Sequence, residues 1–240
     1  MRQFSSEWRR GLYEAILRRR DMRTFRPDRI PAETLARILL AAHRAGSVGF
    51  MQPWNFIIVQ EVELRRKIQA HVESERLRAA DKFQGERRDK YLGFKLEGIL
   101  DAPINICVTC DRTRFGPAVL GRNTVPDTDM YSTCCAIQNL WLAARAEGIG
   151  VGWVSILEPA RLREFLRIPD HVAPLAYLCA GFVDNFPDEP MLQTAGWLNR
   201  LPLSEVVFSE YWGERPDSTL FESLTNATFT IDSSHNVEGA

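Results

Sequence analysis

Four arginines and one aspartate are concentrated within six positions near the N-terminus, in the run Arg18-Arg19-Arg20-Asp21-Met22-Arg23. Like charges this close repel one another, so the arrangement is unfavourable unless an anion neutralises it. A guanidinium group matches phosphate oxygens bidentately and stays charged at any working pH, which favours a phosphate as the ligand. A solvated helix face is the alternative. Asp21 is then either an ion-pair partner of the arginines or a carboxylate held beside a bound ligand.

A second candidate site is the loop Ser47-Val48-Gly49-Phe50-Met51-Gln52-Pro53-Trp54-Asn55. It leads directly into an apolar run at 56–59, which is typical of a buried strand. Serine, glutamine and asparagine side chains at such a junction suit hydrogen bonding to a ligand. A purely structural turn is the alternative interpretation.

Two further patterns suggest chemistry that their context does not support. Cys107 and Cys110 have the spacing of a redox or metal motif, but residues three apart in a strand point to opposite faces. The glycines at 148, 150 and 152 follow a helix and enter a strand, whereas a dinucleotide loop requires the reverse order. The four histidines are dispersed without the spacing of a zinc site, so we expect no metal.

The elements that position these residues follow from apolar spacing and capping residues. We expect helices at about 7–18, 32–46, 130–147 and 158–166, and strands at about 56–59, 103–109, 148–156 and 173–182. Helices interspersed with four buried strands predict an α/β or α+β fold, with a sheet sandwiched by helices. The helix at 130–147 is apolar almost all the way round, which indicates the middle of the protein or a subunit interface.

Length and composition indicate one globular domain. The chain has 240 residues, of which 45% are hydrophobic and 25% charged, and its net charge of -1 argues against general nucleic-acid or membrane-surface binding. We expect a single domain over 1–216 with a charged helical excursion at about 61–100, and a polar, flexible tail at 217–240. Five scattered cysteines suit reduced thiols, and without a secretory signal or an apolar span we expect a cytoplasmic protein.

Several of these segments together resemble the flavin-dependent nitroreductase family in order and spacing: Arg19 to Phe25, Ala41-Ala42-His43, Ser47 to Phe56, and Gly148 to Ser155. The resemblance covers about residues 8 to 213. Nitroreductases usually carry serine where this chain has Asp21, and the run from Ser47 to Asn55 differs from theirs. In both features the chain resembles one branch of the family, the 5,6-dimethylbenzimidazole synthases.

This resemblance implies a nitroreductase-like fold, with a mixed, mainly antiparallel central sheet, in a homodimer with FMN at the subunit interface. It implies an oxidoreductase that consumes reduced FMN together with O2. The products are 5,6-dimethylbenzimidazole, the lower ligand of cobalamin, and erythrose 4-phosphate. The flavin is then a substrate, an external flavin reductase using NAD(P)H must reduce it, and neither a metal, nucleic acid nor a membrane takes part.

The resemblance also assigns roles residue by residue. Arg19, Arg20 and Arg23 match the contacts to the phosphate and ribityl chain, and Arg200 matches, more loosely, a late basic residue that closes over the phosphate. The flavin-contacting positions of the loop correspond to Ser47, Gln52 and Asn55.

Asp21 and Ser155 match the pair that the synthases need for fragmentation. A carboxylate within hydrogen-bond reach can move protons to and from ribityl hydroxyls, and a serine can hold a polar flavin edge. A strand serine bonded to a neighbour is the alternative for Ser155. Two other functions stay open: an NAD(P)H-dependent FMN nitroreductase or flavin reductase, and a non-enzymic module that binds flavin or nucleic acid.

Overall fold

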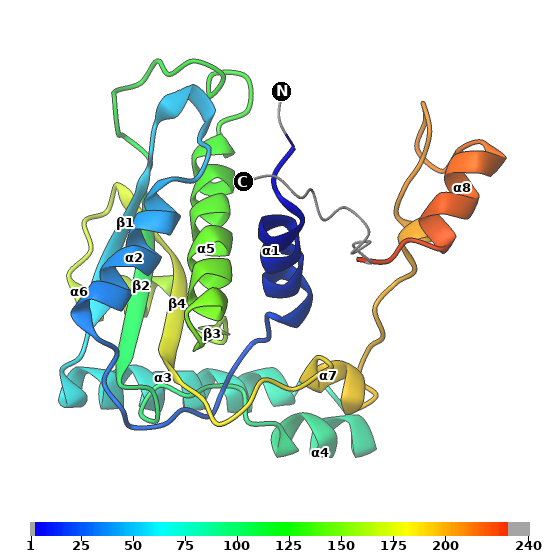
Figure 1. Cartoon of the computed structure of the whole chain (residues 1–240). Coiled ribbons are helices and arrows are strands. Elements are labelled where there is room, and N and C mark those ends of the chain that lie inside the picture. The colour runs from blue at the N-terminus through cyan, green and yellow to red at the C-terminus, as the bar shows by residue number, and fades with distance from the viewer. Residues whose placement is uncertain (1–2, 230–240) are drawn as a thin grey trace, which may run out of the picture. The chain divides into compact units, whose positions relative to one another are not determined.

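A four-stranded antiparallel sheet forms the centre of the computed structural model, which describes residues 3–229. The chain divides into two compact units, one spanning Arg18–Phe186 and the other formed by residues 1–17 and 187–240. The sheet belongs to the first unit. Its strands are β1 (Trp54–Val59), β2 (Ile104–Asp111), β3 (Ile149–Val154) and β4 (Val172–Phe182), in the order β1-β2-β4-β3. Strands β1 and β3 are therefore its two edges (Figure 1).

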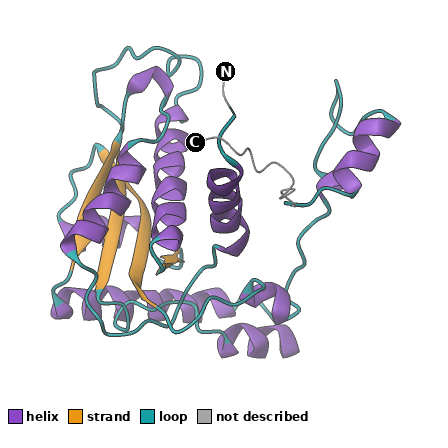
Figure 2. Ribbon diagram, viewed as in Figure 1, coloured by secondary structure: helices purple, strands orange, loops and turns teal. Residues whose placement is uncertain are grey.

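Helices cover both faces of this sheet (Figure 2). Helices α2 (Ala32–His43) and α5 (Thr128–Ala146) pack on one face, against alternate residues of β2 and β4 such as Ile106 and Leu178. On the other face lie α3 (Val62–Ala80) and α6 (Pro159–Leu166), which contact Cys107 and Tyr177. Successive side chains of a strand point to opposite faces of the sheet, so each strand contributes to the core on both sides. The predicted sheet sandwiched by helices is confirmed.

The expected strands and main helices are present, with ends shifted by a few residues. Helix α4 (Gly85–Gly93) follows α3 within the charged segment at 61–100. Helix α5 buries one side, including Leu140 and Trp141, whereas Tyr131, Cys134 and Cys135 on its other side are exposed. Exposed apolar residues on a helix without a polar face are typical of a helix that packs against another protein surface.

A segment from the N-terminal side adds a short parallel pairing to the β3 edge. Asp21 forms an isolated parallel bridge with Val151, and the Met22 N–H donates to the Val151 carbonyl at 2.9 Å. A Cβ on Gly152 would lie 1.9 Å from the Met22 carbonyl oxygen. The glycine-rich run at 148–152 therefore allows close approach of residues 21–22. This packing role accounts for the glycine at 152 without a dinucleotide site.

The second unit contains α1 (Ser6–Arg18) except its last residue. It also contains α7 (Met191–Thr194), η2 (Leu203–Glu205) and α8 (Ser218–Thr225). Within this unit the Tyr13 and Phe229 rings stack with centroids 5.1 Å apart. Helix α8 lies inside 217–240, for which the sequence predicted a polar, flexible tail; that flexibility stays a prediction, and residues 230–240 lie outside the described range. No helix within residues 3–229 is long and apolar enough to cross a bilayer.

Candidate functional site

The arginine segment is held by helix α5. The guanidinium of Arg19 lies over the Trp141 ring, 4.7 Å from its centroid. The indole N–H of Trp141 donates to the Arg20 carbonyl at 3.2 Å, and Arg145 Nε donates to the Arg18 carbonyl at 3.2 Å. These contacts fix the backbone at the point where α1 ends, so the arginines are presented in a defined arrangement. A cation over an aromatic face contributes roughly 0.5–2 kcal/mol.

Asp21 is oriented by two different partners. Its Oδ1 accepts a hydrogen bond from the backbone N–H of Trp153 at 2.8 Å, and its Oδ2 pairs with a guanidinium nitrogen of Arg23. Arg23 also donates to the Asp21 carbonyl at 3.2 Å. Burial raises the pKa of Asp21, while the Arg23 charge, the Trp153 N–H and the Arg19 charge oppose that rise without cancelling it. The result is a fixed carboxyl that binds a proton more readily than an exposed aspartate.

Ser155 follows directly after the last residue of β3 and is exposed. It lines a pocket of about 240 Å³ together with Trp153, Leu162 and Tyr177, among other residues. Because Asp21 is bonded to Trp153, two positions before Ser155, the structure brings the arginine segment, Asp21 and Ser155 to the same edge strand.

The loop residues lie at the opposite edge of the sheet. Ser47 Oγ accepts a hydrogen bond from the Gln52 N–H at 3.1 Å, which closes the short helix η1 (Val48–Phe50) into a compact loop. Asn55 lies on β1, where its Nδ2 donates to Thr109 Oγ1 at 3.3 Å and its Oδ1 accepts from Arg114 at 2.5 Å. Ser47, Gln52 and Asn55 are therefore tied to one another or to the sheet, and their contacts with a ligand stay a prediction.

Two groups of predicted site residues thus lie on different edges of one sheet. Strands β2 and β4 separate β1 from β3, so three strand spacings of about 4.8 Å, roughly 14 Å, lie between β1 and β3, and Asp21 lies one pairing further out. Within one chain, Asp21 and Asn55 are accordingly not neighbours. Arg200 is exposed and belongs to the second unit, so its role at the phosphate stays a prediction.

Three residues at these sites were not singled out by sequence reasoning. Trp141 lies in the predicted apolar helix and Trp153 in the predicted strand at 148–156, and each supplies an N–H that holds the arginine segment. Arg114 lies in a segment predicted only as a loop, and it reaches Asn55. A usable signal existed for Arg114, since a guanidinium carries five N–H donors and no acceptor and therefore needs nearby oxygens such as those of Gln52 and Asn55.

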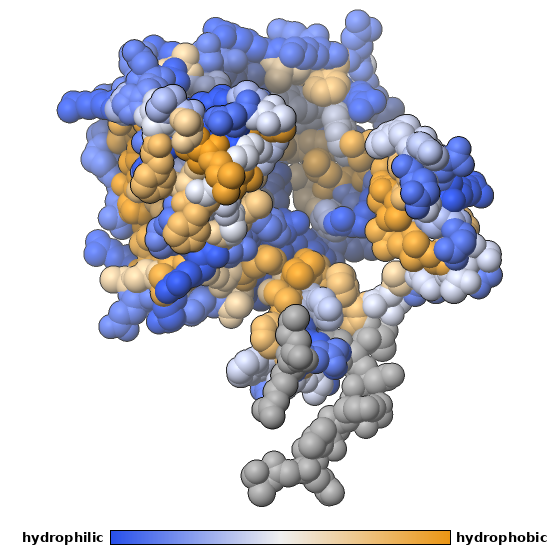
Figure 3. All heavy atoms as spheres, turned by 90° about the horizontal axis from the view of Figure 1, so that it is seen from above, coloured by the Kyte–Doolittle hydropathy of each residue, from blue (hydrophilic) through white to orange (hydrophobic). Residues whose placement is uncertain are grey.

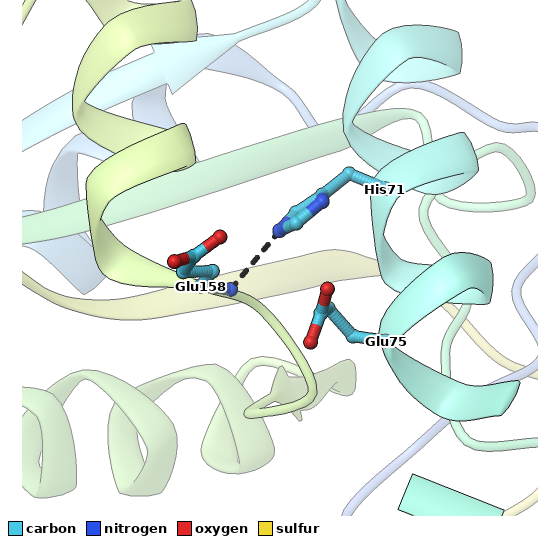
Figure 4. A group of neighbouring side chains, drawn as sticks. All are labelled: His71, Glu75 and Glu158. Carbon is cyan, nitrogen blue, oxygen red and sulfur yellow. Dashed lines mark hydrogen bonds between the residues drawn. The ribbon is translucent and has the colours of Figure 1, made fainter. Parts of the chain in front are cut away.

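Among residues 3–229, one group of potential metal ligands is present, formed by His71, Glu75 and Glu158, each of which offers an atom within 4.8 Å of the others. Figure 4 shows that His71 Nε2 already accepts a hydrogen bond, at 3.2 Å, from the Glu158 backbone N–H. Glu75 pairs with Arg78 at 2.7 Å. These contacts already occupy His71 Nε2 and one oxygen of Glu75, so this group gives little support for a metal site, and the predicted absence of a metal stays a prediction.

The cysteine pair behaves as its spacing predicted. Cys107 lies in the core on the α3 and α6 side of the sheet, whereas the Cys110 thiol is hydrogen-bonded to Thr133 of α5 on the other side. Burial raises the pKa of Cys107 to about 12. A thiol with so high a pKa is a poor nucleophile and a poor metal ligand, which argues against redox or metal chemistry at this pair.

Comparison with known proteins decides the family. The model of the nitroreductase family matches residues 16–182, which includes the whole sheet and the arginine segment after position 18. The chain belongs to the nitroreductase family. The expectation drawn from the sequence segments is therefore confirmed.

Similar members of the nitroreductase family include proteins with a more specific name. The chain is 41% identical over 199 residues to 5,6-dimethylbenzimidazole synthase of Rhodospirillum rubrum, which covers 83% of this chain and 94% of that protein. It is 38% identical to the synthase of Rhodobacter capsulatus, with coverages of 83% and 96%. Among solved structures, oxidised iodotyrosine deiodinase bound to FMN and 3-iodo-L-tyrosine matches with a TM-score of 0.62 at 21% identity, over 73% of this chain and 91% of that one.

Proposed function

We propose that this chain is a 5,6-dimethylbenzimidazole synthase, which uses O2 to fragment reduced FMN into 5,6-dimethylbenzimidazole and erythrose 4-phosphate. The observation that carries the proposal is the carboxylate of Asp21, which Trp153 and Arg23 hold among the arginines. The identities of 41% and 38% to two synthases over most of their length support the same function.

The donor set fits a flavin mononucleotide. Guanidinium groups bind a phosphate through charge-assisted, bidentate hydrogen bonds. One segment supplies three such groups, those of Arg19, Arg20 and Arg23. Ser47, Gln52 and Asn55 supply hydroxyl and amide groups for the polar edge of a ring system. Reduced FMN supplies the electrons that O2 accepts. The chain's own residues bind and orient the flavin and transfer protons to and from it.

Asp21 takes the role of the proton-transferring group. Cleavage of the ribityl chain requires protons to leave and join its hydroxyl groups, and a carboxyl does this when it is within hydrogen-bond reach. Arg23 and the Trp153 N–H orient the carboxyl, and its raised pKa brings it nearer to the working pH. Ser155, at the end of the same strand, holds the polar edge of the ring system.

A homodimer explains why the site residues occupy two sheet edges. In this arrangement the arginine segment, Asp21 and Ser155 of one protomer and the 47–55 loop of its partner face the same FMN. The exposed side of α5, with Tyr131, Cys134 and Cys135, suits burial against a second copy. A separate flavin reductase that uses NAD(P)H supplies the reduced flavin, and the protein acts in the cytoplasm.

The test is to incubate the protein with chemically reduced FMN in air and without O2, and to identify the products by mass spectrometry. We expect 5,6-dimethylbenzimidazole only in air, with at most one molecule formed per flavin lost. Repeated reduction of a nitro compound by NAD(P)H with the flavin intact would instead identify a nitroreductase. Binding of FMN without either reaction would identify a flavin-binding module.

A further inference from the structure

The loop after β2 sends one arginine back to the beginning of β1. Arg114 donates to the carbonyl oxygens of Gln52 at 2.5 Å and of Trp54 at 3.1 Å, and to Asn55 Oδ1 at 2.5 Å. Its side chain is mostly buried, with 27% exposed. A single guanidinium therefore joins three acceptors of the segment that carries the flavin-facing loop residues.

A turn at the end of β2 presents this guanidinium. Asp111 Oδ1 accepts hydrogen bonds from the N–H and the hydroxyl of Thr113, at 2.9 and 2.8 Å, and its Oδ2 lies 3.8 Å from Arg114 Nε. Burial acts to raise the pKa of Asp111, but these hydrogen bonds and the Arg114 charge outweigh it and hold the pKa below its ordinary value. The carboxylate stays ionised and keeps the turn in place.

The contact with Asn55 fixes which end of its amide faces which neighbour. A guanidinium has only donors, so the atom that meets Arg114 must be the amide oxygen. The amide nitrogen then faces Thr109 and gives one of its two hydrogens to that hydroxyl. Its second N–H remains as a donor for an acceptor atom of a ligand. Without Arg114 the amide could rotate and offer its oxygen instead.

The contact with Gln52 acts on the loop itself. Three residues of this loop have a left-handed backbone, namely Gly49 at φ +58°, Phe50 at φ +54° and Gln52 at φ +47°. Residues other than glycine adopt this region at a cost in energy, so the loop persists only where its surroundings hold it. The charged hydrogen bond to the Gln52 carbonyl, together with the bond from its N–H to Ser47, supplies that support.

We propose that Arg114 is a positioning residue of the flavin site. It makes Asn55 a hydrogen-bond donor and holds Gln52 in its left-handed conformation, so that the loop selects a ligand edge rich in acceptors, such as the carbonyl oxygens and ring nitrogens of a flavin. This inference rests on the proposed function. It adds a residue that acts on the ligand only through Gln52 and Asn55.

The test compares Arg114→Gln, Arg114→Lys and Arg122→Gln in the full chain, with the dissociation constant for FMN measured by quenching of flavin fluorescence. Arg122 is the matched control, because it bonds backbone carbonyls of Arg112, Gly116 and Pro117 in the same loop. We expect Arg114→Gln to weaken FMN binding about tenfold and Arg114→Lys to weaken it less, since an ammonium keeps the charge but lacks the planar fork. Arg122→Gln should change it less than about twofold.

A double-mutant cycle with Asn55→Ala separates positioning from general stability. If Arg114 acts partly through Asn55, its loss must matter less when Asn55 is already absent. Melting temperatures of all variants show whether each one folds, and Arg114→Lys serves as the folded variant if Arg114→Gln does not. Equal effects of the Arg114 and Arg122 variants, or strict additivity with Asn55→Ala, overturn the inference alone. Failure of the wild-type chain to bind FMN overturns the proposed function and this inference with it.

Discussion

The carboxylate of Asp21 accepts a hydrogen bond of 2.8 Å from the backbone N–H of Trp153, a residue 132 positions later in the chain. This contact joins the end of the arginine segment to the edge strand β3, immediately before Ser155. The same carboxylate pairs with Arg23 through its other oxygen. Both oxygens of the group are therefore oriented by the chain's own residues, as a proton-transferring group requires.

The first prediction concerns the charge on that carboxyl. Asp21→Asn keeps an oxygen that can accept from the Trp153 N–H but removes the negative charge, the ion pair with Arg23 and the carboxyl that can take up and release a proton. We expect FMN affinity to stay within a few-fold of wild type, while formation of 5,6-dimethylbenzimidazole falls below detection. Fluorescence titration measures the first quantity and chromatography of the products the second. Asp28→Asn, at an exposed ion pair with Arg26, is the control and should retain full activity. Product at the wild-type rate from Asp21→Asn would mean that another group transfers the proton.

The second prediction concerns the pKa of Asp21. Folding raises this pKa above its ordinary value of 3.8, so the folded chain binds the proton more tightly than the unfolded chain does. The contribution of Asp21 to the free energy of unfolding therefore falls as the pH rises from 3.8 to the folded pKa. Arg23→Gln removes the charge that most strongly lowers this pKa, so the pKa should rise further.

Carbon-13 NMR titration of the aspartate carboxyls in the ligand-free protein measures this directly. We expect one carboxyl above its ordinary value in the wild type and still higher in Arg23→Gln. Arg26→Gln, which lies just beyond the arginine segment and pairs with Asp28, should leave it unchanged. In activity assays at saturating FMN, the acidic limb of product formation should move to higher pH in Arg23→Gln alone. A shift to lower pH contradicts the assigned pairing.

The strands and the arginine segment were predictable because their signals are local. Apolar runs bounded by turn residues indicated β1 and β2, and four arginines in six positions suggested an anion site without any knowledge of the fold. The loop at 47–55 was predictable for the same reason. In each case the deciding residues lie within about ten positions of one another.

The partners of these residues were not predictable, since they come from distant segments. Nothing near Asp21 in sequence indicates that Trp153 donates to it, because the donor is a backbone N–H, which every residue except proline carries. Trp141 fits the apolar pattern of α5, which hides its contacts with Arg19 and Arg20. The separation of Asp21 and Asn55 on opposite edges follows from strand order, and strand order depends on packing of the whole sheet.

The third prediction concerns the glycine-rich entry to β3. In Gly152→Ala the new methyl group would lie 1.9 Å from the Met22 carbonyl oxygen, so residues 21–22 must move away from the strand. We expect the free energy of unfolding to fall by about 1–3 kcal/mol and product formation to decrease because Asp21 loses its place beside Trp153. Urea denaturation measures the first effect. Gly11→Ala is the control: it lies in α1 with nothing within 4 Å of the new Cβ, and it should gain about 0.5–1 kcal/mol. If both substitutions stabilise the chain, the close approach at Gly152 is wrong.

The fourth prediction concerns exposed apolar side chains on loops near the start of β1. Phe50, Phe115 and Leu120 are 78%, 70% and 86% exposed, and Gly49 in the first loop lies against Leu120 in the second. These loops lie at the top of Figure 1, and Figure 3 shows the molecule from that side, with hydrophobic residues among hydrophilic ones. If a second copy brings its flavin to this loop, as the proposed dimer requires, Phe50→Ser should weaken FMN binding several-fold while the melting temperature stays within about 2 °C of wild type. Val62→Ser, at a 43% exposed position at the start of α3, should change neither quantity. Equal FMN binding in the two variants would place the flavin away from the loop.

The fifth prediction concerns the phenol of Tyr177, which is 1% exposed and lies among Cys107, Cys179 and Arg65. Within residues 3–229 its hydroxyl has no hydrogen-bond partner, and burial raises its pKa, so the group stays protonated. A buried hydroxyl without a partner costs about 1–3 kcal/mol, and Tyr177→Phe removes it while it keeps the ring. In urea denaturation, we expect the free energy of unfolding of Tyr177→Phe to lie between the wild-type value and about 1 kcal/mol above it. Tyr131→Phe, at a 58% exposed position on α5, should stay within about 0.5 kcal/mol of wild type. A loss of more than about 1 kcal/mol in Tyr177→Phe would instead indicate a buried water that bonds the phenol to Asn105 Oδ1 or Arg65 Nε, two further buried atoms without a partner in the described residues.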